Sequence, residues 1–180
     1  MLMKAETSAL LIVDIQQKLV PALDGASALV EHSLWLSRVA RRLDVPLLVS
    51  EQYPQGLGPT VAELQPLLDG APILEKLHFS AAREPDLFLM PGGDRAQFVV
   101  CGCEAHICVL QTVLDLLAQG RQVFVVAEAV ASRQPANKAL ALERMRQAGA
   151  AIVSREMVAY EWLERAGSEL FRAVSREYLR

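Results

Sequence analysis

The sequence predicts an α/β fold, a three-layer αβα sandwich built on a six-stranded parallel sheet with Rossmann-like topology. Short apolar runs alternate with segments of helical periodicity, and the runs are continuous and rich in β-branched residues, as strands buried on both faces are. The runs begin roughly 25 to 40 residues apart, which is the spacing of βαβ units, and right-handed crossovers then place helices on both faces. The six runs lie at residues 9–13, 46–49, 72–74, 97–101, 122–126 and 150–153.

Helical periodicity indicates the elements between and after the runs. Pro135 suits a first helical turn, and Gly120 and Gly149 fall just past helical segments, where glycine is favoured. Residues 168–179 predict a terminal helix with one apolar stripe, which packs either on the core or on a second subunit. Residues 81–93 form either a short helix or an excursion from the sandwich. The expected crossover helices span residues 28–43, 106–119 and 135–147.

Length and composition restrict the class of protein. A chain of 180 residues, 52% of them hydrophobic, with no repeat and no long flexible linker, fits one domain spanning residues 1–180. Eighteen basic and 21 acidic side chains give a net charge of −3 without a basic stripe, so nucleic acid is not an expected partner. No apolar stretch reaches membrane-spanning length, so no membrane partner is expected. Three cysteines do not form a disulfide framework, which favours free thiols and a cytoplasmic location.

Residues that follow strands are the first candidates for chemistry, because ligands of open α/β sheets bind beyond the carboxyl ends of the strands. Asp14 ends the first apolar run, so its carboxylate is expected to be partly buried and to need a partner. It either caps the next turn through backbone N–H groups or pairs with a cation. Lys76 follows the third run and is either a solvated strand end or that cation, which would keep Asp14 ionised.

Cys108 is the third candidate. The fourth strand is expected to end near Gly102, with the next helix under way by Cys108, so this thiol lies in a first helical turn. There the helix dipole and free backbone N–H groups favour a thiolate and an oxyanion. The alternative is an inert buried thiol, which is the interpretation we give to Cys101 inside the strand, while Cys103 is intermediate.

Other kinds of site are disfavoured by the same segments. A zinc site would need a second cluster of ligands far along the chain, and none is present. A nucleotide site would need a glycine-rich turn after the first strand, but residues 13–17 contain no glycine. A serine esterase would need a Gly-x-Ser-x-Gly turn, which is absent. We therefore expect neither a metal nor a cofactor, although four residues of the types that bind zinc lie close together, at Cys101, Cys103, His106 and Cys108.

Three dispersed motifs resemble the isochorismatase-like cysteine hydrolase superfamily. They are the strand that ends in Asp14, the segment EKLHFS that contains Lys76, and the segment GCEAHICV at residues 102–109. The resemblance covers residues 9–154. The segment SEQYPQGLGPTV at residues 50–61 further resembles the branch of isochorismatase domain-containing proteins, which is related to nicotinamidase and N-carbamoylsarcosine amidase.

The resemblance implies a site as well as an isochorismatase-like hydrolase fold. Its triad would be Asp14, Lys76 and Cys108, with Asp14 and Cys108 meeting where the first and fourth strands lie side by side. The peptide bond between Cys103 and Glu104 would be cis, and the backbone N–H groups of Glu104 and Cys108 would form the oxyanion hole. The implied activity is hydrolysis of a small amide or carbamoyl C–N bond through a thioester.

Two departures from the family pattern narrow this expectation. Members that hydrolyse nicotinamide carry Asp-x-His after the second strand as part of a metal site, where this chain has Glu51, Gln52 and Tyr53. Isochorismate hydrolases of the same fold lack the nucleophilic cysteine, whereas Cys108 is present. The expected partner is therefore a small-molecule substrate that the sequence does not identify.

Pocket walls and subunit contacts are expected from weaker signals. Four residues that are close in sequence to the triad are candidates for substrate binding: Gln16, Gln52, Phe79 and Ile107. The alternative is that they are ordinary loop and first-turn residues. Members of the family commonly form homo-oligomers, so we expect one here. The alternative function is a non-catalytic binding or scaffold protein, with Trp35, Trp162 and the terminal helix at a subunit interface.

Overall fold

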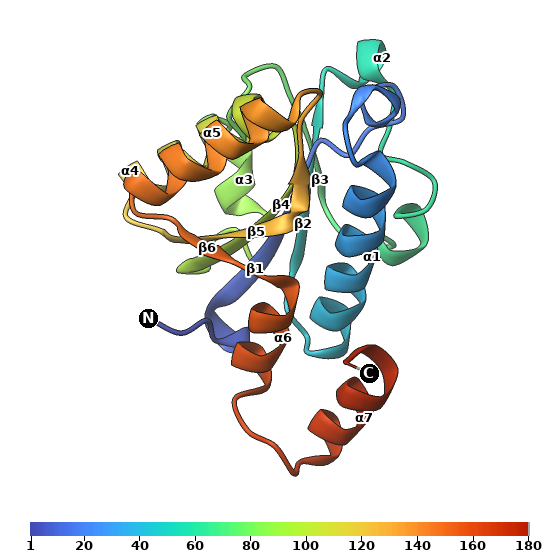
Figure 1. Cartoon of the computed structure of the whole chain (residues 1–180), viewed down its shortest axis with the longest axis vertical. Helices are drawn as coiled ribbons and strands as arrows, with labels where there is room; N and C mark the ends of the chain where they lie inside the picture. Colours follow the sequence, from blue (N-terminus) through green and yellow to red (C-terminus); the bar gives the residue numbers. More distant parts are fainter. Residues whose placement is uncertain (180) are drawn as a thin grey trace.

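The computed structural model describes residues 1–179 and contains one six-stranded, all-parallel sheet in the order β3-β2-β1-β4-β5-β6 (Figure 1). Each of the six predicted runs is a strand, so this part of the prediction is confirmed. The neighbouring strands β1 and β4, between which the chain order of the sheet changes direction, are longer than the apolar runs that predicted them. The strands are β1 (Ser8–Val13), β2 (Leu47–Gln52), β3 (Ile73–Lys76), β4 (Gln97–Cys103), β5 (Gln122–Ala131) and β6 (Ala151–Val153).

The sheet order places the ends of β1, β2 and β4 side by side. Val13 is level with Ser50 of β2 on one side and with Gly102 of β4 on the other. From β1 the chain builds outward through β2 to β3, then returns to start β4 on the opposite side of β1. The carboxyl ends of β1 and β4 therefore form the topological switch point of this sheet, where α/β proteins bind ligands.

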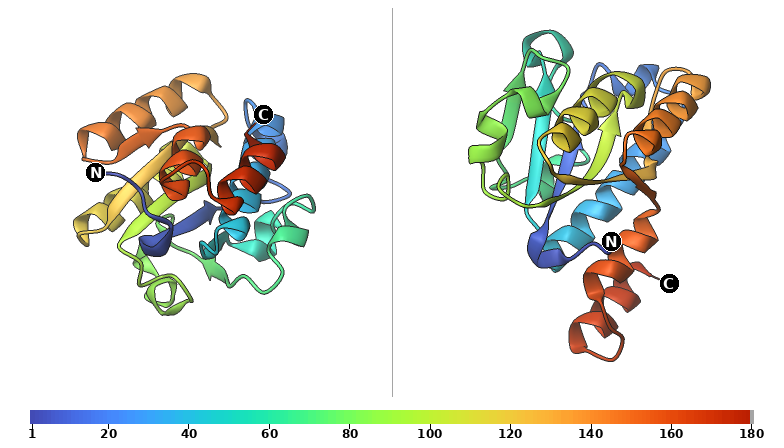
Figure 2. Two further views of the ribbon diagram at one scale, coloured as in Figure 1. Left: turned by 90° about the horizontal axis from the view of Figure 1, so that it is seen from below. Right: turned by 90° about the vertical axis from the view of Figure 1, so that its left-hand side faces the viewer.

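Helices cover both faces of the sheet, which confirms the three-layer sandwich (Figures 1 and 2). Leu10 and Ile12 of β1 pack on the side of α1, α6 and α7, whereas Leu11 and Val13 pack on the side of α3, α4 and α5. The helices are α1 (Ala26–Arg42), α2 (Pro54–Leu57), α3 (Asp86–Leu89), α4 (Leu110–Ala118), α5 (Pro135–Gln147), α6 (Arg155–Leu163) and α7 (Glu169–Tyr178), with 3₁₀ turns η1 (Ala5–Thr7), η2 (Val20–Ala22), η3 (Gln65–Leu67) and η4 (Ala81–Arg83) and a π-helical turn η5 (Ala105–Val109).

The predicted helices are confirmed with two refinements. The second crossover helix begins with the π-helical turn η5, which continues into α4. Helix α6 was not predicted, although Ser154 caps it by accepting a hydrogen bond from the backbone N–H of Met157. Residues 81–93 hold the short η4 and α3, which pack under the α4 face.

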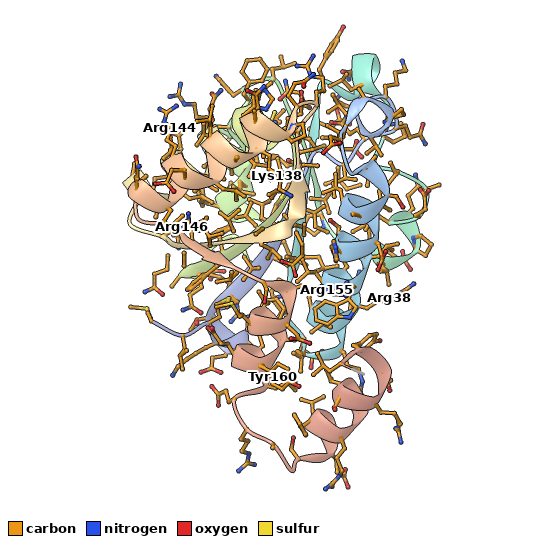
Figure 3. The ribbon with its side chains drawn as sticks, viewed as in Figure 1. Arg38, Lys138, Arg144, Arg146, Arg155 and Tyr160 are labelled. Carbon is orange, nitrogen blue, oxygen red and sulfur yellow. The ribbon has the colours of Figure 1, made fainter. Side chains whose placement is uncertain are left out.

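The terminal helix α7 packs within the chain. Val174 is buried against the α1 face, and the Trp35 indole N–H donates to the Tyr178 carbonyl oxygen at 2.9 Å. The guanidinium of Arg155, labelled in Figure 3, lies 4.8 Å from the Trp35 ring. Trp162 is buried and donates to the Ser8 hydroxyl at 3.0 Å. Of the two expected arrangements, the terminal helix therefore adopts the one in which it packs on the core. No helix within residues 1–179 is long and apolar enough to cross a bilayer.

Candidate active site

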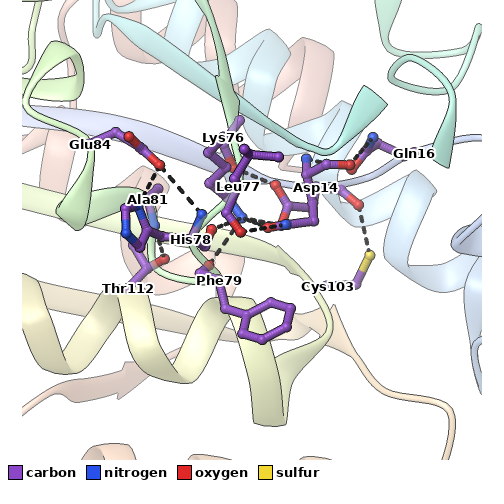
Figure 4. Close-up of polar contacts among 12 residues, drawn as sticks. Asp14, Gln16, Lys76, Leu77, His78, Phe79, Ala81, Glu84, Cys103 and Thr112 are labelled. Atoms are coloured by element: carbon purple, nitrogen blue, oxygen red, sulfur yellow. Dashed lines mark hydrogen bonds and ion pairs between the residues drawn. The ribbon is translucent and has the colours of Figure 1, made fainter. Parts of the chain in front are cut away.

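Asp14 and Lys76 form an ion pair in which both side chains are fully buried. The Lys76 Nζ lies 2.7 Å from Asp14 Oδ2, and both side chains are 0% exposed (Figure 4). The hydroxyl of Ser50, which sequence analysis missed, donates to the other carboxylate oxygen at 2.7 Å. Asp14 adopts a positive φ of 52°, so the chain turns sharply as soon as β1 ends. The carboxylate is therefore held by a cation and a hydroxyl, and it does not cap the next turn.

Lys76 is held by acceptors on every side. Its Nζ donates to Gln52 Oε1 at 2.7 Å, to the Phe79 carbonyl oxygen at 3.0 Å and to the His78 carbonyl oxygen at 3.3 Å, besides Asp14 (Figure 4). Four acceptors use all three protons of the ammonium group. The alternative of a solvated strand end is wrong. A charge this deep is costly unless it is paired, and here both charges have hydrogen-bonded partners.

The Cys108 thiol lies within the influence of both charges. Burial raises the pKa of Cys108 well above its ordinary value, the nearby charge of Asp14 raises that pKa further, and Lys76 opposes the rise. A hydrogen bond between the thiol and Asp14 also raises the pKa of Cys108, and one between the thiol and Lys76 also lowers it. The structure thus brings the three candidate residues together. It also corrects the expectation of a thiolate, because the free site favours the protonated thiol.

The other two cysteines occupy different environments. Cys101 and Cys103 are fully buried, and burial raises the pKa of Cys101 to about 12 and that of Cys103 well above its ordinary range. The Cys103 thiol donates to the Asp14 carbonyl oxygen at 3.0 Å and so fastens the end of β4 to the end of β1. All three thiols are free.

The close approach of β1 and β4 depends on Gly102. Its φ is +128°, and a Cβ atom there would collide with the backbone of Val13. Glycine is the residue that tolerates both conditions. The strand can therefore deliver Cys103 and Glu104 directly beside Asp14.

The peptide bond between Cys103 and Glu104 is cis, as the resemblance implied. The buried Glu104 carboxylate accepts hydrogen bonds from the backbone N–H of Arg133 at 3.1 Å and from its Nε at 2.9 Å. This contact, which sequence analysis missed, fastens the loop after β5 to the residue that follows the cis bond. No local sequence signal links Glu104 to Arg133, because the contact depends on β4 and β5 being neighbours.

The four nominated pocket residues take different positions. Gln16 is fully buried, and its amide bonds the Gln52 carbonyl at 3.0 Å, the Gly58 carbonyl at 2.7 Å and the Gln52 N–H at 2.8 Å. Gln52 donates to the Leu77 carbonyl oxygen at 2.9 Å while its Oε1 faces Lys76, so it orients the ammonium group. Phe79 is 52% exposed and Ile107 is half-buried on the α4 face.

A surface hollow of about 530 Å³ adjoins the ion pair at Lys76. It contains neither Asp14 nor Cys108, so we place the site by its chemistry and not by the hollow. His78, which lines the hollow, pairs with Glu84 at 2.9 Å. Among residues 1–179, no three or more His, Cys, Asp or Glu side chains are grouped so as to hold a metal ion.

Comparisons with known proteins identify relatives over nearly the whole chain. The Isochorismatase domain family matches residues 8–157. Isochorismatase domain-containing protein 2A of Mus musculus is 36% identical over 171 residues, which cover 95% of this chain and 82% of that protein.

Two solved structures have a similar fold. The MAR1 ribonuclease from Caenorhabditis elegans has a TM-score of 0.92 and 33% identity, and the match covers 100% of this chain and 93% of that one. YcaC from Escherichia coli, described as an octameric hydrolase of unknown specificity, has a TM-score of 0.83 and 24% identity, with 91% and 83% covered.

Proposed function

Because the chain belongs to the isochorismatase family, we propose that it is a cysteine-dependent hydrolase of a small amide or carbamoyl C–N bond. Membership of the family supports a hydrolase. One observation carries the finer proposal, namely the buried ion pair of Asp14 and Lys76 acting on the Cys108 thiol. A scaffold protein gains nothing from two buried charges beside a thiol, since an apolar pair of similar size is often as stable.

In the proposed first step, Asp14 accepts the thiol proton as the Cys108 sulfur attacks the carbonyl carbon of the substrate. The raised pKa of Cys108 supports transfer of the proton during the attack rather than before it. The oxyanion would be held by the backbone N–H groups of Glu104 and Cys108, where one well-placed donor is worth about 3 kcal/mol.

In the second step the C–N bond breaks and protonated Asp14 gives its proton to the departing ammonia or amine. Water, deprotonated by the same carboxylate, then attacks the thioester, releasing the acid and restoring the thiol. Lys76 would keep Asp14 charged between the two steps. The mechanism proposed here uses no metal and no cofactor.

The remaining candidates would act around this centre. Phe79 and Ile107 supply half-open apolar surface for substrate, while Gln52 acts through its bond to Lys76. Gln16 would contribute indirectly, by fixing the backbone of Gln52.

RNA is a less favoured substrate, although the Caenorhabditis elegans structure is named a ribonuclease. The chain has 18 basic and 21 acidic side chains, with no basic stripe to follow a phosphate backbone. We expect incubation with labelled single-stranded and double-stranded RNA to leave both intact. Cleavage that disappears in Cys108→Ala would instead assign RNA to this site.

The setting is proposed on the same basis. The functional unit would span residues 1–180, because α7 lies beyond the matched segment 8–157 yet packs on α1. The free thiols favour a cytoplasmic location. A homo-oligomer is proposed as well, with the exposed apolar side chains of Tyr53 and Leu77 offered for contact.

The deciding experiment compares the cysteines without assuming a substrate. Wild-type protein is treated with iodoacetamide over a range of pH, and alkylation of each cysteine is followed by peptide mass spectrometry. We expect alkylation of Cys108 alone, while the fully buried Cys101 and Cys103 remain unmodified. Equal reaction at all three thiols, or none at Cys108, would favour the scaffold alternative.

A second measurement tests turnover directly. A panel of small amides and N-carbamoyl compounds is assayed for ammonia release, with hydroxylamine added to trap a thioester. Cys108→Ala should abolish release, and the matched variant Cys101→Ala should retain it. Undiminished release by Cys108→Ala would overturn the mechanism.

A further inference from the structure

Ser80 carries a buried hydroxyl group that has no hydrogen-bond partner among residues 1–179. The residue is 1% exposed, and no acceptor or donor lies within reach of its Oγ. It occupies the N-cap of η4, where a serine usually accepts a backbone N–H, but its side chain makes no cap hydrogen bond. A buried hydroxyl without a partner is uncommon because it loses its bonds to water.

The backbone on either side of Ser80 spans the candidate site. On one side, the Phe79 carbonyl oxygen accepts from Lys76 Nζ at 3.0 Å. On the other, the Ala81 N–H donates to the Thr112 hydroxyl at 2.9 Å (Figure 4). Ser80 thus lies on the short segment that joins the lysine to the α4 helix.

The π-helical turn η5, which continues into α4, carries the proposed nucleophile. Thr112 of α4 follows Cys108 by four residues, and both side chains are buried. Two further hydrogen bonds attach the segment after Ser80 to this helix. Arg83 Nε donates to the Asp115 carboxylate at 3.0 Å, and Gln119 Nε2 donates to the Ala82 carbonyl oxygen at 3.1 Å. Ser80 therefore lies in a segment that is held at one end by the ammonium group of Lys76 and at the other end by helix α4.

The charges of the site restrict the kind of ligand group to which this hydroxyl can form a hydrogen bond. The protons of Lys76 are all engaged, so the ammonium group has none free for an anionic ligand. Asp14 would repel a carboxylate. A neutral carboxamide fits better, because it offers both a donor and an acceptor, and a serine hydroxyl also does both.

Resting on the proposed function, we propose that Ser80 is a specificity-determining residue whose hydroxyl hydrogen-bonds the uncharged carboxamide group of the substrate. The hydroxyl is dispensable for folding, since it makes no bond in the free protein. It discriminates in favour of ligands that carry an amide at the atom attacked by Cys108, as the substrate does, or directly beside that atom, as iodoacetamide does.

The test uses two small alkylating probes that differ in the amide alone. Iodoacetamide and allyl iodide both react when the Cys108 thiolate attacks the CH₂ carbon, so that a C–S bond forms, the C–I bond breaks and iodide leaves. The thiol proton passes to Asp14 or to solvent. Because both probes consume the same thiolate, the ratio of their rates cancels any change in the pKa of Cys108.

We expect Ser80→Ala to lower this ratio by roughly threefold to tenfold, the effect of one neutral hydrogen bond. Ser80→Thr, which keeps the hydroxyl, should restore most of it. Ser33→Ala is the matched control, because it removes a second buried serine hydroxyl, one that lies beside Cys101 on the α1 face. It should leave the ratio unchanged. The melting temperature of Ser80→Ala should equal or exceed that of the wild type.

Three results would overturn the inference. An unchanged ratio in Ser80→Ala, with Cys108 still reactive, would leave the hydroxyl without a role in recognition while the proposed hydrolase stands. A large fall in melting temperature, or failure to fold, would show that the hydroxyl is structural. An unreactive Cys108 in the wild type would remove the proposed function, and this inference with it.

Discussion

The two ends of strands β1 and β4 both carry buried polar networks, but the networks differ in character. At the amino end, the amide of Gln97 is surrounded by neutral partners and both of its ends are hydrogen-bonded. Its partners are the Lys4 N–H at 2.8 Å, the hydroxyls of Thr7 at 3.0 Å and Ser8 at 3.2 Å, the Leu2 carbonyl at 3.0 Å and the Gln122 Oε1 at 2.9 Å.

At the carboxyl end, the network is charged and incompletely satisfied. It combines the Asp14 and Lys76 ion pair with a thiol whose pKa is raised and with the unpartnered hydroxyl of Ser80. A neutral, fully bonded network stabilises a fold, whereas buried charge and a free hydroxyl add cost unless a ligand uses them. The contrast favours a structural role for the amino end and supports the proposal of chemistry at the carboxyl end.

The largest expected effect comes from removing the charges at the carboxyl end. Lys76→Met should lower amide turnover by about 10³-fold, within the range for loss of general acid–base catalysis. It should also destabilise the protein by about 3–5 kcal/mol, because Asp14 is left buried without its counter-ion. Urea unfolding and ammonia release measure the two effects.

The double variant Asp14→Asn/Lys76→Met sharpens this comparison. With both charges gone, most of the stability should return while turnover stays lost. If the double variant unfolds as readily as Lys76→Met, the ion pair would be a structural feature and the division between the two ends would fail.

The opposite outcome is expected at the amino end. Gln97→Leu leaves the Lys4 N–H and the hydroxyls of Thr7 and Ser8 without their acceptor, at a cost of about 2–4 kcal/mol. Reactivity of Cys108 toward iodoacetamide should be unchanged in the folded fraction. The check is chemical unfolding alongside the alkylation rate, and slower alkylation in fully folded Gln97→Leu would couple the two ends.

The pH dependence of alkylation reports the charges around the thiol. The negative charge of Asp14 raises the pKa of Cys108 and the positive charge of Lys76 lowers it. Asp14→Asn should therefore move the rise in iodoacetamide rate to lower pH, and Lys76→Met should move it to higher pH, each by about one unit or more. Shifts of the same sign in both variants would contradict the arrangement of the three groups.

Most of the sheet and the identity of the three central residues followed from local patterns. Strands buried on both faces leave continuous apolar runs, and the residue after each run marks the carboxyl edge, so Asp14 and Lys76 could be predicted one at a time. The first turn of the next helix nominated Cys108, and the resemblance added the grouping of the three residues as a triad and the cis bond before Glu104. Helix α6 was missed because most of its packing is tertiary.

Partnerships between distant residues were beyond the sequence. The bond from Ser50 to Asp14 needs the β1–β2 register, and the seating of Ser80 needs η4 against α4. Gln16 looked like a pocket residue, yet its amide is occupied by backbone groups of β2 and of the loop before Pro59. Closeness in sequence does not determine which way a side chain points.

The smallest expected effect concerns the link between Glu104 and the loop after β5. Arg133 is 58% exposed, so solvent weakens its ion pair, and Glu104→Gln should change stability by less than about 1 kcal/mol. The neutral amide in this variant cannot accept the two charge-assisted hydrogen bonds from Arg133. The backbone N–H of residue 104, which we assign to the oxyanion hole, is then held less firmly in place. Turnover should then fall by about threefold to tenfold through kcat, with KM nearly constant, because the lost contact acts in the transition state. The variant Arg133→Lys keeps the bond from the backbone N–H and the positive charge, so its turnover should fall less. An equal fall of turnover in both variants would attribute the effect to the guanidinium group and not to the position of the loop.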